Sequence, residues 1–151
     1  DNFHPLNSHV IPGLMRRFHE AKINNDHEIA IWGTGNAMRE FLNVDDMAIA
    51  SLFVLELEKD VYLANTLPMC SHINVGTGVD VTIHELAKIM KKIIGFEGKI
   101  IFDTSKPDGS PRKLIDVSRL NRMGWSSSVE LEDGLKNTYS WYEKNLANID
   151  R

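Results

Sequence analysis

Short apolar runs that end near a glycine alternate along this chain with segments in which apolar residues recur at helical spacing. Apolar side chains at positions 10, 11, 14, 15 and 18 predict a helix over residues 10–21. The run 29–32, ended by Gly33, predicts a strand, and residues 39–44 predict a second short strand. Residues 47–57 are apolar on nearly every side and predict a helix packed on two faces, with Asp45 or Asp46 as its cap.

The second half of the chain continues the alternation. Thr82 and Glu85 form a capping-box pattern that predicts a helix ending at Gly95. Other expected elements are strands over 71–75 and 99–102, a loop over 105–111, a short helix over 116–123 and a last helix capped by Ser128. Strands that alternate with helices indicate the α/β class. They are few, short and unequally spaced, so we expect less than a complete doubly wound sheet.

Composition excludes several classes of protein. The 151 residues carry a net charge of −4, which argues against general nucleic-acid binding. No apolar run approaches the roughly 18 residues of a membrane span, so we expect no membrane association. Cys70 is the only cysteine and favours a reducing, cytoplasmic setting. The chain opens at Asp1 without Met or a signal-peptide pattern, which we interpret as the start of a fragment.

Two features of a reductase are missing from the sequence. A dinucleotide fold uses a glycine-rich turn that lets the backbone approach a pyrophosphate. The pairs Gly33–Gly35 and Gly76–Gly78 lack the third glycine. A short-chain reductase also needs a Lys four residues after a Tyr, and no tyrosine in the chain has one. We therefore expect no hydride transfer by this chain alone.

Several stretches carry a family resemblance. Residues 39–48, REFLNVDDMA, are similar to a stretch of extended short-chain dehydrogenase/reductases that act on nucleotide sugars. Residues 1–21, with DNFHP, SHVIP and RRFHEA, and residues 105–114, SKPDGSPRKL, closely resemble the bacterial GDP-L-fucose synthase family. The segments IWGTG at 31–35 and HINVGTG at 72–78 fit that family too. The resemblance covers nearly the whole chain.

The resemblance implies a fold and an activity. The family is an NADPH-dependent epimerase–reductase that converts GDP-4-keto-6-deoxy-D-mannose to GDP-L-fucose, and it is dimeric. Residues 1–151 would be one fragment: the GDP-sugar-binding domain, with elements that complete a Rossmann-like domain whose amino-terminal half is absent. NADP would bind mainly to that absent half, and no metal is implied.

His9 is the candidate catalytic residue. Epimerisation beside a ketone removes a proton from one face of the sugar and returns one to the other, and histidine can act as the donor. The family places a His at the matching position as general acid, near the nicotinamide cofactor, so His9 is also the implied cofactor-binding residue. The alternative is a loop histidine that caps the following helix.

The resemblance also implies four substrate-binding residues. Arg17 and Arg39 would bind the diphosphate, since arginine binds phosphate oxygens in bidentate fashion. Trp32 would offer an apolar face, and Asp108 would accept from sugar or ribose hydroxyls. The alternatives are a solvated helix face for Arg17, an ion pair with Asp45 or Asp46 for Arg39, core packing for Trp32 and a turn role for Asp108. Arg112 and Lys113 are weaker phosphate-binding candidates.

Two other functions stay open from the sequence. One is the substrate domain of another extended nucleotide-sugar epimerase or dehydratase. The segments around Ser8–His9 and 106–113 argue against this possibility, because they resemble the GDP-L-fucose synthase family. The other is a non-catalytic module that binds nucleotide sugars or another protein. The coding sequence upstream of Asp1 would distinguish these possibilities.

Overall fold

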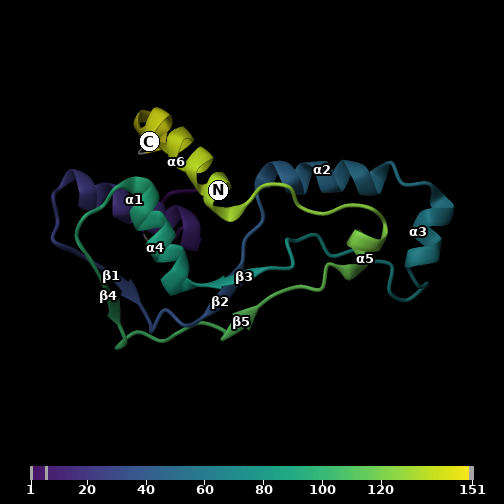
Figure 1. Ribbon diagram of the computed structural model, residues 1–151, viewed down its shortest axis with the longest axis horizontal. Coiled ribbons are helices and arrows are strands. Elements are labelled where there is room, and N and C mark those ends of the chain that lie inside the picture. The colour runs from purple at the N-terminus through teal and green to yellow at the C-terminus, as the bar shows by residue number, and fades with distance from the viewer. Residues whose placement is uncertain (1, 6, 150–151) are drawn as a thin grey trace. The chain divides into compact units, whose positions relative to one another are not determined.

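The computed structural model describes residues 2–5 and 7–149 (Figure 1). The chain divides into two compact units. The first comprises residues 1–37, 82–111 and 132–151, and the second comprises residues 38–81 and 112–131. Each unit has its own small sheet, so the α/β class is confirmed, and the described residues form no complete doubly wound sheet.

The first unit is built on a parallel strand pair. Strand β1 (Glu28–Trp32) pairs in parallel with β4 (Lys99–Asp103). Helices α1 (Val10–Ile23) and α4 (Ile83–Ile94) pack against one another, and α6 spans Leu131–Ile149 (Figure 1). Ile29 and Ile31 point into the core, while the alternate residues of β1 are exposed. The core joins aromatic and aliphatic side chains from all three helices, including Met15, Phe18, Leu86, Met90, Ile94, Leu135 and Tyr142.

The predicted capping box forms at the start of α4. The Thr82 hydroxyl accepts from the Glu85 amide at 3.1 Å, and the Glu85 carboxylate accepts from the Thr82 amide at 2.8 Å. Two further amides of the first turn donate to the carbonyls of Ala37 and Gly35. The helix ends at Gly95, which is left-handed at φ 74°. Local sequence signals therefore fix both ends of α4.

The second unit holds three short strands and three helices. Strand β2 (Met38–Glu40) lies between β3 (Asp80–Thr82) and β5 (Arg112–Lys113), and its pairing with β5 is parallel. The helices are α2 (Val44–Leu55), α3 (Lys59–Asn65) and α5 (Ser118–Arg122). Ala50, Leu120 and Trp125 form the centre of a small apolar cluster, on which Ile73 and Val75 also pack. Neither β3, β5 nor α3 was expected from the sequence.

Both predicted caps around α2 and α6 were wrong. Asn43 caps α2, because its side-chain oxygen accepts from the Asp45 amide at 2.8 Å. Asp46 is buried in the first turn and instead accepts from the Ser128 amide, the Ser128 hydroxyl and the Val129 amide, at 2.8–3.0 Å. Ser128 therefore donates hydrogen bonds to a residue of α2, and α6 begins only at Leu131.

Two predicted strands also changed. The strand expected over 39–44 ends at Glu40, because Asn43 must turn to cap α2. Residues 71–75 form no strand, although their composition suits one. A strand needs the backbone of a neighbour. Among the described residues none pairs with this segment, and only Leu67 and Cys70 beside it form an isolated bridge.

The helix predicted over 47–57 is confirmed as α2, and most of its apolar side chains are exposed. Only Asp46 and Ala50 of α2 are buried. Met47, Ile49, Leu52 and Leu55 are 43%, 54%, 57% and 80% exposed. No helix among the described residues is both long and apolar enough to cross a membrane.

Candidate functional site

Arg17 reaches from α1 to the backbone of β1. Its guanidinium donates to the carbonyl oxygen of Ala30. Partial burial lowers the pKa of Arg17 from its ordinary value. The Arg17 side chain is therefore partly buried and bound to the strand, which differs from a fully solvated helix face.

Trp32 ends the same strand with its side chain outside the core. It is 68% exposed, which excludes core packing. The Lys106 ammonium lies 5.8 Å from the centre of its ring, at cation–π distance. A flat aromatic face beside a cation suits a nucleotide base and its phosphates, and Lys106 would have to move if a base stacked on that face.

Asp108 closes the turn that follows Trp32. Its carboxylate accepts from the Thr34 amide at 2.9 Å and from the Thr34 hydroxyl at 2.7 Å. These hydrogen bonds hold the pKa of Asp108 below its ordinary value. Gly33 has φ +83°, and a Cβ there would collide with the Asp108 carboxylate. Asp108 therefore forms no turn with Gly109 but binds the turn at 33–35, and its carboxylate keeps acceptor capacity for a hydroxyl.

His9 lies at the N-cap position of α1 and is exposed. Its side chain makes no capping hydrogen bond, so His9 caps the helix only through its backbone carbonyl, which accepts from the Gly13 amide at 2.9 Å. His19, within α1, differs from His9 because it is buried, with its Nδ1 3.0 Å from the Tyr139 hydroxyl. His9 is therefore the histidine at the start of α1 whose ring is placed to meet a molecule from outside.

Arg39 lies in the second unit, on the central strand β2. Its register partner on β5 is Lys113, and register partners on parallel strands carry their side chains on one face of the sheet. The two cationic residues therefore belong to the same face of the sheet, where an anion could bind both. Arg39 also donates to the Met38 carbonyl at 2.6 Å. From the sequence alone, Arg112 and Lys113 had equal standing as phosphate-binding candidates. A strand of two residues shows no alternation that would assign them to opposite faces of the sheet.

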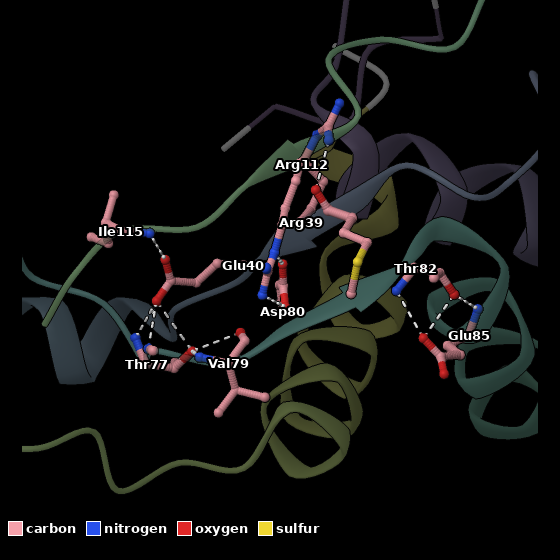
Figure 2. Close-up of polar contacts among 11 residues, drawn as sticks. Arg39, Glu40, Thr77, Val79, Asp80, Thr82, Glu85, Arg112 and Ile115 are labelled. Carbon is pink, nitrogen blue, oxygen red and sulfur yellow. Dashed lines mark hydrogen bonds and ion pairs between the residues drawn. The ribbon is translucent and has the colours of Figure 1, made fainter.

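Arg112 is bound to a carboxylate of strand β3. Its guanidinium donates twice to the Asp80 carboxylate, at 2.6 and 3.1 Å, and Asp80 is only 7% exposed in its side chain (Figure 2). The hydrogen bonds from Arg112 hold the pKa of Asp80 below its ordinary value. The Arg112 guanidinium is therefore bound to Asp80, which leaves Lys113 as the better placed of the two phosphate-binding candidates.

Neither glycine pair is arranged as a pyrophosphate cradle. The Thr34 amide of the first turn donates to Asp108, and the Thr77 and Gly78 amides of the second donate to Glu40, both at 2.7 Å. Backbone amides already bound to the chain's own carboxylates are not available to phosphate oxygens. The expectation that these turns do not bind a dinucleotide agrees with this geometry.

Comparison with known proteins places the chain in a family. The family model described as "NAD dependent epimerase/dehydratase family" matches residues 1–76, just over half of the 151 residues. The chain belongs to this family. As a member of the epimerase/dehydratase family it has close relatives among nucleotide-sugar enzymes.

Two curated relatives are named as GDP-L-fucose synthases. The protein from Escherichia coli strain K12 is 59% identical over 145 residues, which cover 96% of this chain and 45% of the relative. GDP-L-fucose synthase 1 of Arabidopsis thaliana is 53% identical over 98% of this chain and 43% of the relative. The chain thus spans less than half the length of these epimerase/dehydratase relatives.

A solved structure of a GDP-L-fucose synthetase from Naegleria fowleri, bound to NADP, has a similar fold. It superposes with a TM-score of 0.85 at 25% identity, over 100% of this chain and 45% of that one. The α/β assignment and the epimerase/dehydratase membership are therefore supported by both sequence and fold.

Proposed function

We propose that this chain is the GDP-sugar-binding, carboxy-terminal portion of a GDP-L-fucose synthase. The whole enzyme would convert GDP-4-keto-6-deoxy-D-mannose to GDP-L-fucose by inverting carbons 3 and 5 and reducing the ketone at carbon 4. The observation that carries the proposal is the 59% identity to the Escherichia coli enzyme over 96% of the chain. The exposed ring of Trp32 lies beside Lys106, and Arg17 is bound to the Ala30 carbonyl of the same strand; both support a nucleotide site in the first unit.

His9 is proposed as the general acid of the epimerisation. The ketone acidifies the protons on carbons 3 and 5. At each carbon a base supplied by the remainder of the enzyme removes one proton, and the His9 imidazolium returns one from the opposite face. Each inversion therefore leaves the proton count of the sugar unchanged. The exposure of His9 to solvent supports this assignment.

The nucleotide-binding roles are proposed for five side chains. Trp32 would stack on the base, and Asp108 would accept from a ribose hydroxyl with the capacity that Thr34 leaves. Phosphate-binding roles are proposed separately for Arg17 in the first unit and for Arg39 with Lys113 in the second.

NADP is the proposed cofactor, as in the Naegleria fowleri structure. When bound, it supplies the hydride for carbon 4. Both glycine turns of this chain are closed on its own carboxylates, so the dinucleotide would be held mainly by the remainder of the enzyme, with His9 beside the nicotinamide.

Titration calorimetry with GDP, UDP and NADPH tests the proposal. We expect the 151-residue chain to bind GDP weakly and in preference to UDP. We also expect that the full-length enzyme, but not this chain alone, binds NADPH tightly. Equal affinity for GDP and UDP would remove the guanine assignment, and tight NADPH binding by the chain alone would overturn the division of roles.

A further inference from the structure

The Glu40 carboxylate binds two separate segments of the second unit. One oxygen, Oε1, accepts from the Thr77 and Gly78 amides at 2.7 Å and from the Thr77 hydroxyl at 3.3 Å. The other, Oε2, accepts from the Ile115 amide at 3.1 Å. Figure 2 shows this carboxylate between the turn at 76–79 and the chain that follows β5. We refer to these four hydrogen bonds as the Glu40 clamp.

The surrounding backbone is shaped to this carboxylate. Gly76 lies so close to Glu40 that a Cβ at residue 76 would overlap its Oε1. Gly78 has φ +75°, a conformation that glycine adopts without strain. Four donors converge on two oxygens, and a carboxylate can accept all of them because it carries no hydrogen of its own. Glutamine would turn an N–H group toward one of the donors.

The clamp lies on the face of the sheet opposite to Arg39. Met38 and Glu40 are two residues apart on β2 and therefore share one face, which Arg112, the register partner of Met38, also occupies. The Arg112–Asp80 ion pair joins β5 to β3 on either side of β2. Arg39 and Lys113 point to the other face.

The clamp compensates for weak strand pairing. β2 and β5 are paired at only two positions, Met38↔Arg112 and Arg39↔Lys113. So short a ladder holds its register poorly without further contacts. The Ile115 amide bound to Glu40 lies two residues beyond Lys113, so the glutamate continues the attachment of β5 to β2 past the last paired residues. The register sets the distance between the Arg39 and Lys113 side chains.

We propose that Glu40 is a positioning residue for the diphosphate of the substrate. It touches no substrate itself. By fixing β2 against β5 and the 76–79 turn, it holds Arg39 and Lys113 as register partners on one face of the sheet. The inference rests on the proposed function, because it takes Arg39 as a phosphate-binding residue.

A double-mutant cycle in the full-length enzyme tests the role. GDP and guanosine affinities are measured for wild type, Arg39→Ala, Glu40→Gln and the double variant. We expect Arg39→Ala to weaken GDP binding about tenfold and Glu40→Gln roughly threefold to tenfold, with guanosine affinity unchanged. The double variant should be little weaker than Arg39→Ala, because the glutamate acts through the arginine. Glu56→Gln, an exposed carboxylate at the end of α2, is the control and should match wild type.

The outcomes separate this inference from the proposed function. If Arg39→Ala leaves GDP affinity unchanged, the phosphate role of Arg39 fails. If Arg39→Ala weakens binding but Glu40→Gln does not, or if the two effects add fully, the positioning role alone is wrong. Equal losses of GDP and guanosine affinity would show a general loss of structure and would also overturn it. Glu40→Asp, which keeps the charge but shortens the reach, should bind GDP between wild type and Glu40→Gln.

Discussion

At the scale of single residues, carboxylates do most of the long-range joining in this chain. Asp46, Glu40 and Asp108 each accept from backbone amides of a segment far away in the sequence. A carboxylate that accepts several N–H groups is stabilised in its charged form. For Asp46, burial alone would raise the pKa, but the hydrogen bonds from Val129 and Ser128 lower it below its ordinary value.

Replacing Asp46 should lower the free energy of unfolding, because its carboxylate joins α2 to Ser128 and Val129. Asp46→Ala leaves three donors without an acceptor and should cost about 1–3 kcal/mol of unfolding free energy at pH 7. Asp46→Asn can still accept from the two amides and donate to Ser128, so it should cost less. Urea unfolding measures both, with Asp45→Ala, an exposed neighbour in the same helical turn, as the control.

The same pair of variants has a defined pH dependence. The folded pKa of Asp46 lies below the unfolded value of about 3.9. The contribution of ionised Asp46 to the free energy of unfolding is therefore fully present above the unfolded pKa. It is lost as pH falls through the folded pKa. The stability gap between wild type and Asp46→Asn should narrow below about pH 4. A gap that stayed constant from pH 7 to pH 2 would contradict the assignment.

At the scale of elements, α2 is helical but exposes most of its apolar side chains. The neighbouring segment 57–70 adds Val61, Leu63, Leu67 and Met69, the last 98% exposed. Apolar patches of this kind mark surfaces that meet another protein surface. We propose that in the whole enzyme the dinucleotide-binding half covers this patch.

As an isolated chain, the protein should associate through the same patch. Sedimentation over a concentration series is expected to show reversible self-association. Leu52→Glu with Leu55→Glu should shift it toward monomer, because the charges would have to be buried. Ile23→Glu, an exposed apolar residue of α1, is the control and should leave association unchanged. A monomer at the highest concentrations would count against the prediction.

Local signals predicted the helices better than the strands. Thr82, Glu85 and Gly95 fix α4 through contacts within a few residues, and the sequence displays them. Residues 71–75 have the composition of a strand, but pairing depends on a neighbour that composition does not reveal. β5 has two residues, too few for any periodicity. The pairing of Arg39 with Lys113 and the hydrogen bonds from Ser128 to Asp46 could not be predicted from the sequence either, because both depend on tertiary structure.

At the scale of the whole molecule, the proposed enzyme separates epimerisation from reduction. Losing one general acid–base group typically costs roughly 10²–10⁴-fold in rate. We expect His9→Gln in the full-length enzyme to lose epimerisation rate by such a factor, with weakened solvent-deuterium incorporation at carbons 3 and 5. GDP affinity should fall much less than for Arg17→Ala or Arg39→Ala.

Deuterium exchange read by NMR, beside an NADPH-consumption assay, measures these effects. Ketone reduction without inversion should become visible as a side product. His19→Gln is an unsuitable control, because that histidine is buried against Tyr139, so the exposed His27→Gln is used instead. Wild-type exchange at both carbons in His9→Gln would return His9 to a loop or cofactor-orienting role.

The long reach of Asp46 also matters while the chain is being made. Its partner Ser128 lies 82 residues later. At about 5–20 residues per second, a ribosome adds those residues in roughly 4–16 seconds. During that interval the residues of α2 have been made, but the Asp46 carboxylate lacks the three donors of Ser128 and Val129 that bind it in the folded chain. The nascent chain therefore passes through several seconds in which the start of α2 is not attached to residues 128–129, and this period ends only when those residues leave the exit tunnel.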